Sequence, residues 1–114
     1  MAKGIRSGDA PFHVQTLIVA GNSQATAMAV SALSSPAMIL VAGNAVGGII
    51  LPAGSKGKVY LIKNIGTQSM QTLLIYPGVG SQVNILGVNN PYSLPIQMTN
   101  WFFSDGAGTW HTEV

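Results

Sequence analysis

Short apolar segments alternate with turn-forming residues along most of this chain. The segments are rich in β-branched and aromatic residues, and Gly, Pro, Asn, Asp and Ser separate them. This pattern predicts strands at residues 13–19, 37–41, 48–51, 58–65, 72–76, 82–85, 92–96, 100–104 and 109–112. Residues 24–34 (QATAMAVSALS) fit a helix or a strand, and we favour a strand because no charged residue marks a helix end.

Strands this short and numerous predict an all-β fold, namely a single jelly-roll-like β-sandwich of about eight short antiparallel strands. The 114 residues suit one domain. We assign residues 12–114 to the β-sandwich domain and residues 1–11 (MAKGIRSGDAP), which are polar and aperiodic, to a flexible N-terminal arm. Because residues 1–11 hold no apolar segment, no signal peptide is expected. No internal repeat is evident.

The strand predicted at residues 58–65 is apolar on both faces. Val59 and Leu61 alternate with Tyr60 and Ile62, and successive residues of a strand point to opposite sides of its sheet. We therefore expect the second sheet to cover one side and a neighbouring subunit to cover the other.

The last predicted hairpin carries four large aromatic rings, those of Trp101, Phe102, Phe103 and Trp110. Its connection, residues 104–109 (SDGAGT), contains glycines that accept positive φ and an Asp that can bond the turn backbone. Aromatic cross-strand pairs contribute about 0.2–1 kcal/mol each. We interpret all four rings as structural residues that close the sandwich.

Charge is scarce and unevenly placed. Charged residues make up 7% of the chain, against about 25% in ordinary soluble domains, and none lies between Asp9 and Lys56 or between Lys63 and Asp105. Because subunit interfaces are depleted in charge, this pattern predicts a surface covered by neighbouring chains. A neutral monomer kept soluble by Ser, Thr, Asn and Gln is the alternative.

Charge and hydropathy also exclude two classes of partner. The net charge of +2 is small and scattered, which predicts no nucleic-acid partner. Apolar runs are far shorter than the roughly 20 residues of a membrane helix, so no membrane partner is expected.

Few residues are suited to catalysis or metal binding. The titratable candidates are His13, His111, Asp9, Asp105 and Glu113, and no Gly-x-Ser-x-Gly elbow is present. The chain has no cysteine, and its two histidines belong to no spaced ligand pair. We therefore expect no enzymatic activity, no bound metal and no cofactor.

The second half of the chain resembles proteins of tailed bacteriophage virions. The residues that carry the resemblance are Ile50-Leu51-Pro52, 57–66 (GKVYLIKNIG), Leu74-Ile75-Tyr76-Pro77, Gly80, Val83-Asn84, Phe103-Ser104-Asp105-Gly106 and Thr109-Trp110. The pattern is similar to small β-rich head-decoration (cement) proteins and to β-modules of phage tails and fibres. A chain of 114 residues that begins at Met1 favours the decoration protein over the fibre module.

The resemblance implies a structural protein on the outer capsid surface of the virion. It implies a homotrimer whose other partner is the major capsid protein, and it brings no catalytic residues. Family members often grip the shell with an N-terminal arm, a role that would fall here to residues 1–11. We name as capsid-binding candidates Lys3, Ile5, Arg6 and Asp9.

Two alternatives remain open from the sequence. The first is a tail, neck or fibre-tip module that binds a host glycan by stacking sugar on Trp101, Trp110 or Tyr92. The second is a small β-barrel enzyme or ligand-binding protein with both histidines in one pocket.

Overall fold

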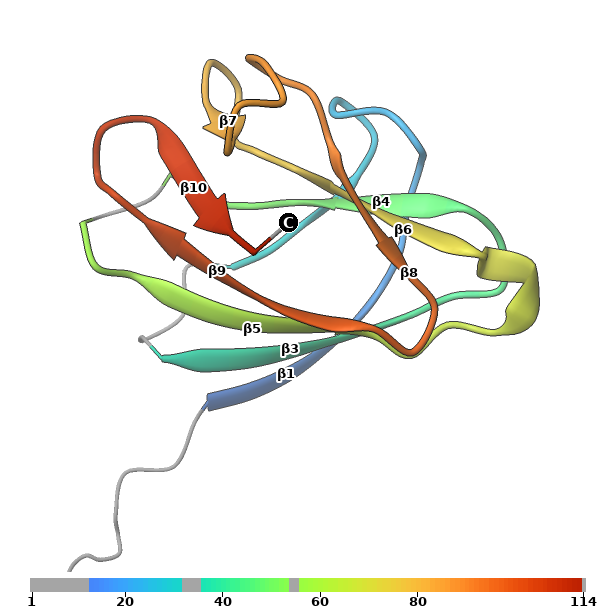
Figure 1. The fold of residues 1–114 in the computed structure, drawn as a ribbon. Helices are drawn as coiled ribbons and strands as arrows, with labels where there is room; N and C mark the ends of the chain where they lie inside the picture. The colour runs from blue at the N-terminus through green and yellow to red at the C-terminus, as the bar shows by residue number, and fades with distance from the viewer. Residues whose placement is uncertain (1–12, 32–35, 54–55, 114) are drawn as a thin grey trace, which may run out of the picture.

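The structure, a computed structural model, describes residues 13–31, 36–53 and 56–113. These residues form ten strands and one short 3-10 helix (Figure 1). The elements are β1 (His13–Ile18), β2 (Met28–Ala29), β3 (Ala37–Ala42), β4 (Gly47–Ile50), β5 (Val59–Asn64), η1 (Gln68–Met70), β6 (Thr72–Tyr76), β7 (Gln82–Val83), β8 (Tyr92–Pro95), β9 (Thr99–Ser104) and β10 (Thr109–Thr112).

The strands form two sheets, and the first six strands alternate between them. One sheet has the order β1-β3-β5-β9-β10-β7 and the other β2-β4-β6-β8. Within each sheet these first strands pair in parallel, β1 with β3 and β3 with β5, β2 with β4 and β4 with β6. The chain therefore winds as a solenoid of three coils, each of which gives one strand to each sheet (Figure 1).

The last four strands extend both sheets beyond the third coil. β8 pairs antiparallel with β6, β9 pairs antiparallel with β5, and β10 returns antiparallel along β9. β7 lies parallel to β10 at the edge of the six-stranded sheet. The opposite edge of that sheet is β1.

The all-β prediction is confirmed, but the antiparallel jelly roll of about eight strands is wrong. The described residues form ten strands, and the first six pair with one another only in parallel. The turn signals at Gly21-Asn22 and Gly43-Asn44 follow β1 and β3 at corners between the sheets rather than within hairpins. Hydrophobic alternation locates strands but does not give their direction. For this reason the predicted antiparallel topology was wrong.

The coils form a structural repeat that the sequence did not reveal. His13 pairs with Ala37 and Ala37 pairs with Tyr60, which gives a coil of about 24 residues, within the range of solenoid repeats. The ambiguous segment at residues 24–34 contributes only the two-residue strand β2 among its described residues.

The core lies between the two sheets and follows the alternation of each strand. The six-stranded sheet contributes Ile39, Val41, Tyr60, Ile62, Phe102 and Trp110, and the four-stranded sheet contributes Ile49, Leu73, Ile75 and Leu94. Trp110 stacks on Tyr60 with ring centroids 5.4 Å apart. The structural interpretation thus holds for Phe102 and Trp110. It does not extend to Trp101 and Phe103, whose side chains are 39% and 47% exposed.

A buried amide fastens the end of β5 to β8. Asn64 is fully buried; its Nδ2 donates to the Leu94 carbonyl at 2.9 Å, and its Oδ1 accepts from the Gly66 amide at 2.9 Å. Both bonds satisfy backbone groups that would otherwise be buried without partners. The asparagine therefore fixes the corner at which the chain leaves β5.

Candidate interaction surface

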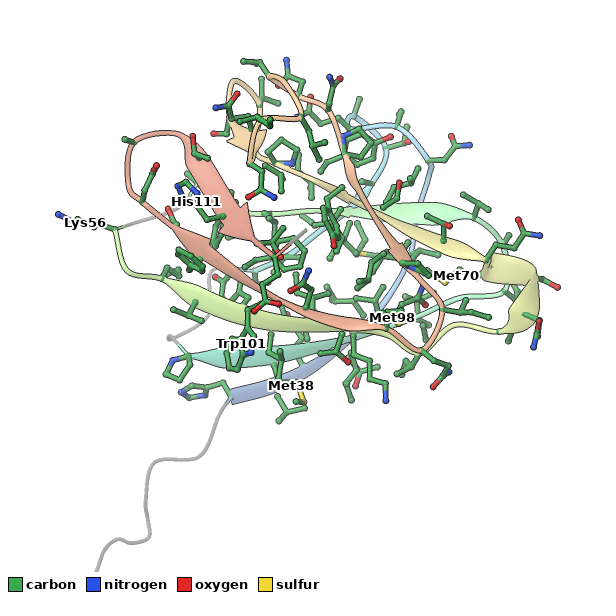
Figure 2. All side chains as sticks on the ribbon, in the orientation of Figure 1. Met38, Lys56, Met70, Met98, Trp101 and His111 are labelled. Carbon is green, nitrogen blue, oxygen red and sulfur yellow. The ribbon has the colours of Figure 1, made fainter. Side chains whose placement is uncertain are left out.

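The outward face of the six-stranded sheet is apolar over four adjacent strands. Alternate residues of β1, β3, β5 and β9 point away from the core. We call this set the apolar sheet face, and it comprises Val14, Ile18, Met38, Leu40, Val59, Leu61, Trp101 and Phe103. Figure 2 shows Met38 and Trp101 on the side of the sheet that faces away from β4, β6 and β8.

The ladder register makes part of this surface continuous. Val14 pairs with Met38, Met38 with Leu61, and Leu61 with Trp101, so one apolar row crosses four strands. Val14 and Ile18 are 62% and 66% exposed.

The apolar sheet face is about as large as the largest apolar patch of an ordinary monomer. Four strands about 4.8 Å apart and about 20 Å long give a face of roughly 400 Å². The largest apolar patch of an ordinary monomer is about 300–600 Å² and is often functional. Lys63 is the only Lys, Arg, Asp or Glu in the four strands. The face is therefore suited to contact another protein surface that is also poor in charge.

A groove lies at one end of the apolar sheet face, where β1 and β3 end and the chain has just left β5. Its volume is about 350 Å³, and it is lined by Ile18, Ala42, Gly43, Asn44, Ile65 and Thr67. No lining residue is charged. We call this hollow the end groove. A smaller hollow of about 170 Å³ lies beside the last hairpin and is lined by Ala53, Ser81, Ser104, Gly108, Thr109 and Trp110.

A second apolar surface lies in the loops on either side of β7. Val79, Ile85, Leu86 and Val88 are 81%, 95%, 44% and 56% exposed. We call these four residues the apolar loop. The sequence pattern did not reveal it, because Ile85 lies in the strand predicted at residues 82–85, whereas β7 ends at Val83. The glycines around these aliphatic residues and the missing charge were the available signals.

The structure brings two of the candidate catalytic residues together. His111 Nε2 lies 3.0 Å from Asp105 Oδ2, and the imidazole stacks on Phe103 with centroids 5.5 Å apart. Asp105 Oδ1 also accepts hydrogen bonds from the backbone amides of Ala107 at 2.7 Å and Thr109 at 3.3 Å. The predicted turn role of Asp105 is confirmed.

These contacts change the titration of Asp105. The Ala107 amide, and after it the His111 side chain, lowers the pKa of the Asp105 carboxyl because both stabilise its charged form. Within the described part of the chain, the imidazole makes no hydrogen bond to a Ser or Thr hydroxyl. The Asp105–His111 pair therefore has the geometry of a contact that stabilises the turn, which we call the turn clasp, and not that of a base that activates a nucleophile.

The two histidines do not share a site. His13 begins β1 and pairs with the inward-facing Ala37, whereas His111 on β10 pairs with the outward-facing Phe103. Three strands separate β1 from β10, which corresponds to about 19 Å. Over the described ranges, no group of three or more His, Asp or Glu side chains could hold a metal ion. The same ranges contain no helix long and apolar enough to cross a membrane.

The other predicted contact residues have mixed outcomes. Trp110 is buried, and the Tyr92 hydroxyl accepts a hydrogen bond from Asn100 Nδ2 at 2.9 Å while its ring meets Phe102 edge-on. Of the three aromatic residues named for glycan binding, Trp101 is the most exposed. The capsid-binding candidates Lys3, Ile5, Arg6 and Asp9 lie outside the described residues.

Comparison with known proteins gave no match to a family model, to a curated protein or to a solved structure.

Proposed function

We propose that this protein is a structural virion protein that decorates and stabilises the capsid of a tailed bacteriophage. It acts as a homotrimer on the outer capsid surface and bridges copies of the major capsid protein. The observation that carries this proposal is the apolar sheet face, which crosses four strands, is nearly charge-free and lies outside the core. A surface of this kind marks a protein–protein contact.

The residues of the virion resemblance support the same surface. Residues 57–66 and 103–110 supply β5, the end of β9 and the start of β10, which are neighbours in the six-stranded sheet. Three copies held together would meet several capsid subunits at once. Weak contacts that act together in this way give strong attachment, because all must break before the trimer leaves.

We also propose that the protein has no enzymatic activity and binds no cofactor, nucleic acid or membrane. The support for the lack of activity is the placement of the titratable side chains. Asp105 and His111 form an exposed turn clasp, and His13 lies on the other face of the sheet. A catalytic site needs several such groups within reach of one substrate.

The test measures decoration of undecorated capsids of the phage that encodes the chain. Full-length protein and a variant without residues 2–10 are compared for folding by circular dichroism and for bound copies per particle. We expect the truncated protein to fold but to bind poorly, and we expect high salt to weaken binding of the full-length protein because Lys3 and Arg6 contribute attraction. Equal, salt-resistant binding of both proteins would show that the β-domain alone attaches.

One observation favours a second candidate, a tail, neck or fibre-tip module that binds a host glycan. Trp101 and Phe103 are 39% and 47% exposed on one face of β9, and exposed aromatic rings stack on sugars. Titration of host surface oligosaccharides, followed by tryptophan fluorescence, tests this candidate. Saturable binding that is lost in Trp101→Ala supports it, and an unchanged spectrum at millimolar sugar excludes it.

A further inference from the structure

We infer that copies of this chain associate head to tail, with the apolar loop of one copy seated in the end groove of the next. This inference rests on the proposed self-association and gives it a specific contact. The capsid is not needed for it.

The side chains of the apolar loop are exposed aliphatic groups, which are typical of a surface that another protein covers and unusual in a turn that faces water. Ile85 is 95% exposed and Val79 is 81% exposed, although no charged residue lies between Lys63 and Asp105 to keep this part of the chain solvated. Scattered exposed aliphatic residues need no explanation, but a cluster of four does.

Hydrogen bonds hold the loop in a single shape. Asn89 Oδ1 accepts from the Gly80 amide at 2.8 Å and from Gln24 Nε2 at 3.2 Å, while the Asn89 amide donates to the Ser81 carbonyl at 2.8 Å. Asn90 Nδ2 donates to the Leu86 carbonyl at 2.8 Å. Positive φ angles at Gly80, Gly87 and Asn89 permit this tight path. A loop ordered beforehand loses little entropy on docking.

Further hydrogen bonds connect the apolar loop to the hairpin of β9 and β10. Asn84 Oδ1 accepts from the Thr112 amide at 2.9 Å, and the Asn84 amide donates to the Trp110 carbonyl at 2.8 Å. Ile85, the next residue, therefore projects from backbone that is tied to the rigid edge of the six-stranded sheet. Its side chain is presented outward without support from the core.

The end groove matches such a side chain in size and polarity. Its volume of about 350 Å³ exceeds the ~150 Å³ of an apolar cavity that holds benzene. Ile18, Ala42 and Ile65 supply apolar walls, and Ile18 is 66% exposed in the single chain. Because no lining residue is charged, the groove offers no ion pair to a charged side chain. It therefore suits a neutral aliphatic loop.

The two surfaces cannot meet within one copy. The apolar loop flanks β7, and the end groove begins at β1, and these strands are the opposite edges of the six-stranded sheet (Figure 1). A contact between two different surfaces of identical chains is heterologous, and repetition around a threefold axis closes it into a ring. A second copy is thus the occupant that uses both surfaces at once.

The test is sedimentation velocity of the full-length chain at micromolar concentration, with one loop variant and one groove variant. Ile85→Asp and Ile18→Asp each place a charge in the contact, and we expect each to weaken association about 100-fold or more. The matched control is Met28→Asp. Met28 is 37% exposed on β2 of the four-stranded sheet and belongs to neither the apolar sheet face, the end groove nor the apolar loop. The control variant should remain a trimer.

Mixing the two variants makes the test independent of folding defects. Ile85→Asp retains an intact groove and Ile18→Asp retains an intact loop, so an equimolar mixture should form a dimer that contains one chain of each. Circular dichroism and thermal melting of each variant confirm that it is folded before mixing.

The possible failures are distinguishable. A trimer that persists in Ile85→Asp, or a mixture of folded variants that stays monomeric up to about millimolar concentration, where one contact should suffice without the other two of the ring, overturns the head-to-tail contact and leaves the homotrimer proposal standing. A wild-type chain that is folded and monomeric at every concentration overturns both.

Discussion

Truncation of Trp110 should remove much of the stability of this domain. Its side chain is 2% exposed and stacks on Tyr60, and its backbone is paired with Ser104 on β9 and with Val83 on β7. A buried tryptophan covers about 150–250 Å², so its loss at about 25 cal/mol per Å² costs about 4 kcal/mol. With partial collapse of the cavity, we expect Trp110→Ala to lose 3–5 kcal/mol, about a third to a half of a typical domain's stability.

The assay is urea unfolding followed by far-ultraviolet circular dichroism, with all proteins at one concentration because self-association would shift the midpoint. Trp101→Ala is the control, since it removes the same ring from the same hairpin at a site that is 39% exposed. It should cost less than half as much. A Trp110→Ala protein within about 1 kcal/mol of wild type, or a larger loss in Trp101→Ala, would refute the assignment of Trp110 to the core.

Three further predictions concern polar and turn positions. Asn64→Ala should lose about 2–4 kcal/mol in the same urea assay, because the Leu94 carbonyl and the Gly66 amide lose their buried partner; an effect below 1 kcal/mol would contradict this. Because the folded pKa of Asp105 lies below the ordinary value of about 3.8 for an Asp carboxyl, its contribution to stability should be present above pH 4 and should be lost as the pH falls through the folded pKa. The wild-type urea midpoint should therefore fall more than that of Asp105→Asn between pH 5 and pH 2.5, and equal falls would refute it. Gly108 has φ of 95° with open space around it, so Gly108→Val should lower the thermal midpoint more than Gly108→Asn, and the reverse order would count against a turn constraint.

The positions of the strands could be predicted because burial sets a period of two along each of them. Residues 72–76 and 109–112 were predicted with the bounds that the structure gives, since buried and less buried positions alternate between turn residues. β2 was the weakest case, because alanines fit a helix as well as a strand, and among the residues of this segment that the structure describes only Met28 and Ala29 form a strand.

The direction of the strands could not be predicted, because parallel partners come from distant residues. Val-Ala-Gly-Asn occurs at residues 19–22 and again at residues 41–44, but a match of four residues is not a convincing repeat, and its offset of 22 residues differs from that of the ladder, which pairs Ile18 with Ala42. The two spacings differ, so the repeated letters do not reveal the coil. In an ordinary parallel sheet a helix makes the crossover, and here the other sheet does.

The sequence predicted an apolar outer surface but not which residues of the other strands continue it. Alternation in residues 58–65 indicated that both faces of that strand are apolar, and the structure puts Tyr60 and Ile62 inward and leaves Leu61 half-buried outside. The continuation across Val14 and Met38 depends on the parallel register, which the sequence does not give. The apolar loop depends on the side-chain amides of Asn89 and Asn90, which bond backbone groups nine and four residues away, and the hydrophobic alternation of the sequence does not indicate these bonds.

The most direct test of the proposed decoration role is a cryo-electron microscopy map of the phage particle that this proposal assigns to the chain. If the proposal is correct, density on the outer capsid shell will fit three copies of the two-sheet solenoid around a local threefold axis. Protein will cover the apolar sheet faces. Density that fits this chain only at the tail, neck or fibres, or a virion that lacks the chain, would contradict the account.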